Sequence, residues 1–140
     1  MADGHVATLI IETELPIAMT CAEATGIAKG ALLKLTDPFT AIVHSGDEDY
    51  FAGIAAEEKI GGDGITKIAV YRGGIFKMET IAAITAGESV ALSATTLKIK
   101  KTDATCVAGK AIGLALETSG GDTETILVEI KPGANNNAYT

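Results

Sequence analysis

The chain has few of the side chains from which enzymes and nucleic-acid-binding proteins usually build their sites. It has no tryptophan, three tyrosines, three phenylalanines and two histidines, and Arg72 is its only arginine. The formal net charge is −7, and the one basic cluster (Lys98, Lys100 and Lys101) is too small to replace the counterions of a phosphate backbone. We therefore expect a protein that is not an enzyme and has no nucleic-acid partner.

Patterns that would hold a metal or a cofactor are also missing. Asp47, Glu48 and Asp49 could contact a cation, but they lack the alternating oxygen ligands and the closing glutamate of a calcium loop, so we expect a solvated loop. His5 and His44 have no acidic or cysteine neighbours at the spacing of zinc ligands. The sequence predicts no metal and no cofactor.

The two cysteines and the apolar runs indicate a cytoplasmically made protein. Cys21 and Cys106 lie far apart and form no C-x-x-C motif, which favours two buried, reduced thiols and leaves a disulfide as the alternative. The apolar run at residues 6–11 is too short for a signal-peptide core or a membrane span. We expect synthesis in the host cytoplasm and no membrane partner.

The residues that are abundant favour β structure. Apolar residues make up 47% of the chain, most of them Ala, Ile, Leu or Val, and there are 16 glycines. Branched side chains fit a pleated sheet and glycines suit tight turns. We predict strands at residues 6–12, 31–36, 40–44, 51–57, 66–72, 75–78, 89–92, 96–100, 110–117 and 125–131, with one short helix at 79–84.

An internal repeat runs along the chain at an offset of roughly 60 residues. The stretch AGIAAE (residues 52–57) matches IGLALE (residues 112–117), and each half then reaches Gly-Gly-Asp and a strand. Pairing Ile68 with Val128 and Val70 with Ile130 keeps one face of that strand apolar, whereas a slip of one residue would place Val70 on Glu129.

The glycine-rich stretch from Gly61 to Gly74 resembles a phosphate-binding loop in composition. Such a loop leads into a helix N-terminus, but here a β-branched strand follows. Left-handed turn geometry explains the glycines without a ligand. We therefore expect a hairpin turn here and an equivalent one at Gly120-Gly121-Asp122.

These features predict a mostly β fold, a compact β-barrel or β-sandwich-like domain built from two related modules of roughly 60 residues, with at most short helices. Residues 1–15 are expected to form an extended N-terminal arm. Residues 16–133 would form a single β-rich domain, with repeat halves at about 27–74 and 84–133. Residues 134–140 would be a polar C-terminal tail.

Two stretches resemble biotinyl and lipoyl carrier domains, which are also built from two similar halves. TAGESVAL (residues 85–92) is similar to their G-[DE]-x-V turns, and FKME (residues 76–79) to the hairpin that carries biotin. The resemblance implies Lys77 as an attachment site at an exposed hairpin tip. A carrier domain, or another β-rich binding module, is the alternative function.

A longer stretch, residues 32–79, resembles the head decoration or cement proteins of tailed phages, the lambda type among them. The resemblance rests on the order of its features: an acidic glycine loop at Gly46-Asp47, then Gly53-Ile54-Ala55, a Gly/Asp turn, the aromatic-basic pair Tyr71-Arg72, and a hairpin at Gly74-Ile75-Phe76. The AGESVAL and GLALE stretches of the second half resemble a broader group of small capsid-associated proteins.

This resemblance implies a homotrimer on the exterior of the virion capsid, with the major capsid protein as its partner. In such proteins the N-terminal arm often adds a strand to a capsid protein. By position, that role falls on an apolar run in the arm, which comprises Val6, Ala7, Thr8, Leu9, Ile10, Ile11 and Glu12.

Overall fold

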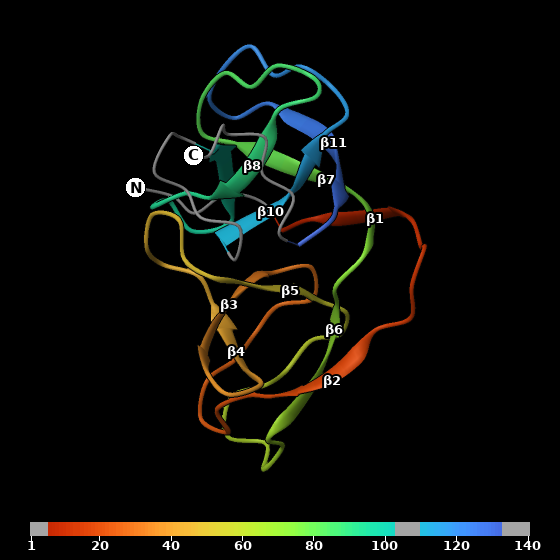
Figure 1. The fold of residues 1–140 in the computed structure, drawn as a ribbon. Helices are drawn as coiled ribbons and strands as arrows, with labels where there is room; N and C mark the ends of the chain where they lie inside the picture. Colours follow the sequence, from red (N-terminus) through yellow and green to blue (C-terminus); the bar gives the residue numbers. More distant parts are fainter. Residues whose placement is uncertain (1–5, 103–109, 133–140) are drawn as a thin grey trace.

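The chain folds into two five-stranded β-barrels that follow one another in the sequence (Figure 1). The computed structural model describes residues 6–102 and 110–132. Its strands are β1 (Thr8–Ile11), β2 (Ile17–Thr20), β3 (Leu32–Asp37), β4 (Thr40–Val43), β5 (Phe51–Ala55), β6 (Lys67–Tyr71), β7 (Gly74–Thr80), β8 (Ser89–Leu92), β9 (Lys98–Lys101), β10 (Ala111–Ala115) and β11 (Thr125–Ile130). The predicted fold class, mostly β with two modules, is confirmed.

The two barrels have the same topology. The first closes in the order β2-β4-β3-β5-β6, and the second closes as β7-β11-β10-β8-β9 through a pairing of β7 with β9. In each barrel one pair of strands is parallel, β2 with β4 and β7 with β9. The amide of Gly30 donates to Ala55 at 2.8 Å, and the amide of Gly87 donates to Ala115 at 2.7 Å. The repeat in the sequence is therefore a duplicated barrel.

In the last strand of each barrel, the residues that correspond between the two barrels differ by two positions from the pairing predicted from the sequence. The amides of Ala69 and Leu127 each donate, at 2.9 Å, to a glutamate that follows the preceding strand, so these two residues correspond. Ile68 thus matches Ile126 and not Val128. The loop before β11 (residues 116–124) is two residues shorter than the loop before β6 (residues 56–66). Because the slip is even, the apolar face still points inward.

Both predicted Gly-Gly-Asp turns lie in these equivalent loops. In the first, Gly62 and Gly64 have left-handed φ values of 80° and 81°, which glycine adopts at little cost. In the second, the left-handed residue is Thr123, with φ 68°. The hairpin interpretation of the first loop is confirmed, since β5 and β6 pair antiparallel around it.

Both barrels have a glycine at a bulge in their fourth strand. At Gly53 (φ 147°) a Cβ atom would lie 2.5 Å from the carbonyl oxygen of Tyr71, and at Gly113 it would lie 1.9 Å from that of Glu129. The strand register shifts next to each glycine. Only a residue without a side chain lets the neighbouring backbone come this close.

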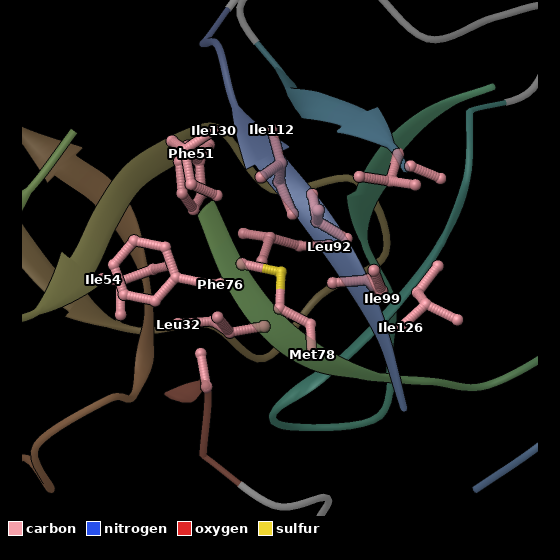
Figure 2. Packing of buried hydrophobic residues seen from close by; sticks show 14 of the residues in the cluster. Leu32, Phe51, Ile54, Phe76, Met78, Leu92, Ile99, Ile112, Ile126 and Ile130 are labelled. Carbon is pink, nitrogen blue, oxygen red and sulfur yellow. The ribbon is translucent and has the colours of Figure 1, made fainter. Parts of the chain in front are cut away.

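The hydrophobic core joins the barrels. One buried cluster fills the first barrel and contains Met19, Leu33, Ile68 and Val70. The other fills the second barrel and also includes Leu32, Phe51 and Ile54 from β3 and β5 of the first, which pack beside Phe76, Met78 and Ile130 (Figure 2). The two modules therefore share buried apolar surface.

Three local predictions are wrong. β2 was not predicted, because in its short sequence IAMT only Met19 is buried. The helix predicted at residues 79–84 is absent: Glu79 and Thr80 end β7, where Glu79 pairs in register with Thr125. No hairpin forms at Gly74-Ile75-Phe76, where the resemblance places one: these residues begin β7, and the chain passes there from the first barrel to the second.

Candidate interaction surface

The predicted arm lies against the body of the protein as an edge strand. β1 pairs antiparallel with the first half of β7, with Thr8 opposite Lys77 and Leu9 opposite Phe76. β9 pairs with the second half of β7, so β1 extends the sheet beyond the closed barrel. In the strand order of the described residues, β1 is terminal and has a neighbour only at β7.

Three contacts hold the arm in this position. Ala7 is buried in the core cluster, and its amide donates to the carbonyl of Gly30 at 2.8 Å. Gly30 is left-handed (φ 87°), and a Cβ there would lie 2.4 Å from the carbonyl oxygen of Ala7. At the other end of the arm, the hydroxyl of Tyr71 donates to Glu12 at 3.0 Å. The arm is thus fixed along the junction of the two barrels (Figure 1).

The aromatic-basic pair Tyr71-Arg72 supports this junction. The ring of Tyr71 packs edge-on against Phe76, with centroids 5.6 Å apart. Burial raises the pKa of Tyr71, and the hydrogen bond to Glu12 raises it further, so the hydroxyl stays protonated as a donor. The guanidinium of Arg72 donates to the carbonyl of Ala52 at 3.0 Å. The feature that carried the family resemblance in the sequence therefore joins β6, β7 and the arm.

The outward side of the arm is apolar. All four residues of β1 are exposed, and Ile10, Ile11 and Leu15 have exposed fractions of 49%, 52% and 79%. Val6 and Leu9 line a groove of about 480 Å³ that is also lined by Tyr71 and Phe76. Exposed branched side chains on an unpaired strand edge offer both apolar contact and backbone hydrogen bonds to an extended segment of another chain.

The structure thus brings the seven predicted residues Val6, Ala7, Thr8, Leu9, Ile10, Ile11 and Glu12 to one edge but divides them by role. Ala7 is buried and Glu12 is bonded to Tyr71, so these two attach the arm to the body. The other five present side chains at the surface. Leu15 and Ile17, two further exposed apolar residues, were missed because they follow the strand-like run.

The acidic loop predicted to be solvated is instead a contact between the barrels. Glu48 is buried, and its amide donates to Leu92 in the second barrel at 2.8 Å. The ammonium of Lys100 lies 2.8 Å from Asp47 and 3.2 Å from Glu48. Burial would lower the pKa of Lys100, but these two carboxylates outweigh it and raise the pKa well above its usual range.

The remaining acidic residue of this loop, Asp49, shapes the loop itself. Its carboxylate accepts the amides of Ser45 at 3.1 Å and Gly46 at 2.7 Å. Burial acts to raise its pKa, but these amides outweigh the burial and lower the pKa. The carboxylates of the loop are therefore engaged in contacts within the chain.

The basic run is also engaged in ion pairs. Lys98 lies 2.6 Å from Asp122 and 3.7 Å from Glu79. The hydrogen bond from Lys98 lowers the pKa of Asp122, and the same bond raises the pKa of Lys98. Two of the three lysines thus neutralise acidic side chains of the protein itself.

The described residues offer little to a cofactor or a metal. They contain no group of three or more His, Cys, Asp or Glu side chains arranged around a common point. Cys21 is a buried free thiol whose pKa is raised by burial, and Cys106 lies outside the described residues. Lys77 pairs with Leu127 and Thr8 in the middle of β7, not at the hairpin tip that a carrier domain requires. Within the described ranges, no helix is long and apolar enough to cross a membrane.

Comparison with known proteins assigns a family to this architecture. A family model described as phage cement protein matches residues 11–130, which include both barrels and the end of β1. No curated protein matches the chain. The match confirms the resemblance to head decoration proteins that the sequence indicated.

Proposed function

Because the chain belongs to the phage cement protein family, we propose that it binds the outside of an assembled head and stabilises it by bridging neighbouring subunits of the major capsid protein. We further propose that it acts as a homotrimer. A cement protein is a structural component of the virion capsid and needs no catalytic site. The alternative role as a carrier is disfavoured by the position of Lys77 within a sheet.

The apolar edge strand β1 is the observation that carries the proposal. A strand of the capsid protein can add to the outer edge of β1, where backbone hydrogen bonds provide affinity and Ile10, Ile11 and Leu15 provide apolar contact. The arm is already held on the barrel junction by Ala7 and Glu12, so little conformational freedom is lost on binding.

Two further properties of the chain suit a cement protein, namely the core that the barrels share and the negative net charge. The shared core makes a compact body that transmits load between subunits. A contact that exists only on the assembled shell stabilises the shell by mass action, and several such contacts in one trimer add avidity. The net charge of −7 disfavours adhesion to the genome.

Co-sedimentation with assembled heads tests this function. The purified chain is mixed with heads that lack it, and the bound fraction and the temperature of head disruption are measured. We expect saturable binding and a higher disruption temperature. Absence of binding to mature and expanded heads alike would contradict the proposal.

Point variants locate the binding surface better than a deletion of residues 1–14, because that deletion also removes the core residue Ala7. The double variant Ile10→Asp, Leu15→Asp should stay folded, since both side chains are exposed, and should bind heads about tenfold or more weakly. Leu116→Asp, at an exposed site on the second barrel, is the matched control and should bind normally. Equal binding by the wild type, the double variant and Leu116→Asp would exclude the arm as the contact.

A further inference from the structure

The first strands of the two barrels, β2 and β7, correspond residue by residue. Ile17 pairs with Val70 in β6, and Phe76 pairs with Val128 in β11. Val70 and Val128 are equivalent, because each directly follows one of the two matched residues of the last strands. Ile17 of the first barrel therefore corresponds to Phe76 of the second.

The outer edge of β7 is covered in both of its halves. β9 pairs with the second half, and β1 runs antiparallel along the first, with Thr8 opposite Lys77 and Leu9 opposite Phe76. Beside β1, Phe76 has an exposed fraction of only 2%. The second barrel thus shows what fits this edge, namely an extended antiparallel segment with an apolar residue opposite Phe76.

Among the described residues, no strand covers the first half of the same edge of β2. β2 has only β4 and β6 as neighbours, and β4 pairs with it only at Thr20. Ile17 accordingly has an exposed fraction of 41%, and Ala18 is exposed as well. We call Ile17 and Ala18 the open edge of β2. It is the place that β1 occupies on the second barrel.

The backbone of Ala18 directs its hydrogen-bonding groups to this open side. The amide of Thr20 donates towards β4, to Phe39 at 2.9 Å, whereas the amide of Cys21 donates towards β6, to Thr66 at 2.9 Å. Successive peptide groups of a strand point to opposite edges, so Ala18 faces the same side as Thr20. Its N–H and C=O lie where an added strand can bond to them.

We propose that the open edge of β2 binds an extended segment of the major capsid protein, antiparallel to β2, with an apolar residue opposite Ile17 as Leu9 is opposite Phe76. The inference rests on the proposed capsid binding and adds a second contact to the one at β1. A capsid segment is favoured over the arm of a neighbouring copy, because β1 of each copy is already paired with its own β7. Strand addition of this kind gains affinity from backbone hydrogen bonds.

The second contact gives a single chain the means to bridge. Only residues 12–16 separate β1 from β2, so two strand edges that can each take a capsid segment lie close together in the sequence. One chain then holds two segments at once, and binding at the first raises the effective concentration at the second.

Binding to assembled heads that lack the chain tests the backbone contact. Ala18→Pro removes the amide that points outward and leaves the bonds from β2 to β6 in place, and strands tolerate proline at such an edge position. We expect the variant to keep the thermal midpoint of the wild type and to bind heads about tenfold or more weakly. A folded Ala18→Pro variant that binds as well as the wild type would overturn the inference.

Ile17→Lys tests the apolar contact without changing the backbone, and it decides the matter if Ala18→Pro proves unstable. Because Ile17 is partly exposed, a lysine there can extend its ammonium into solvent, so the fold should persist while heads are bound about tenfold or more weakly. Leu116→Lys, at a position with a similar exposed fraction of 43%, is the matched control and should bind normally. Equal binding by Ile17→Lys and Leu116→Lys would contradict the proposed contact.

Amide exchange of the wild-type chain, free and bound to heads, locates the contacts. We expect exchange at Ala18 and at residues 8–11 to slow on binding. Slowing at residues 8–11 alone would overturn this inference and leave the capsid proposal standing. Slowing at Ala18 in the concentrated free chain would show that neighbouring copies pair at this edge, which also overturns the inference. A chain that binds no head at all contradicts both proposals.

Discussion

At the scale of single residues, the glycines of this chain have separate physical roles that composition alone does not reveal. Gly62 and Gly64 provide left-handed turns with open space around them, whereas Gly113 lets two backbones touch. The sequence predicted the first role from clustered glycines. The second was visible only as an identity between the two halves, because a bulge depends on which strand lies opposite.

Gly113→Ala should therefore be far more harmful than a glycine change in a turn. The new methyl would lie 1.9 Å from the carbonyl oxygen of Glu129, so β10 and β11 would have to separate. We expect a loss of about 2–4 kcal/mol in the free energy of unfolding, measured by urea denaturation. Gly121→Ala is the control, since nothing lies within 4 Å of a Cβ there. Similar values for the two variants would show that the close approach does not constrain β10.

At the scale of elements, the sequence predicted ten of the strand regions but not how loops meet across the barrels. The acidic loop at residues 44–50 illustrates the difference. Its charges are typical of a solvated segment, yet Glu48 is buried against Leu92 and paired with Lys100. The interacting residues lie about 50 positions apart, and no local pattern encodes such a pairing. The arm is similar: its strand character was predicted, but its pairing with β7 was not.

Lys100→Ala tests this contact between elements. The change removes a cation that lies beside the buried carboxylate of Glu48, and a buried charge that loses its counterion is costly. We expect the free energy of unfolding to fall by about 2–4 kcal/mol. Lys101→Ala, at an exposed position of the same strand, should change it by less than about 0.5 kcal/mol. If the two variants are equally stable, the loop does not depend on this ion pair.

At the scale of the whole molecule, the repeat predicted two related modules but left their relation open. The structure shows that they share a core, because Leu32, Phe51 and Ile54 of the first barrel pack in the cluster of the second (Figure 2). Alternating apolar residues indicate that a strand has a buried face. They do not indicate whether that face meets the interior of its own barrel or a neighbouring barrel, so the junction could not be predicted.

Phe51→Ala should accordingly destabilise both barrels together. Phe51 is almost fully buried, and truncation of such a side chain costs about 3–5 kcal/mol. Amide exchange should accelerate in β2 and β6 of the first barrel and in β10 and β11 of the second by similar factors, because both depend on the shared cluster. Tyr50→Ala, at the exposed neighbouring position, should leave amide exchange slow in both barrels. Acceleration limited to the first barrel would show that the modules unfold independently.

The pairing of β1 with β7 also has a mechanical consequence. β7 is the strand with which the second barrel begins, and it is paired with β1, β9 and β11. A pull on the arm along its own axis loads the β1–β7 hydrogen bonds in shear, so they resist together rather than opening one after another. If the arm binds the capsid as proposed, tension at the arm would therefore pass into a closed ring of strands, which has no free edge at which to tear.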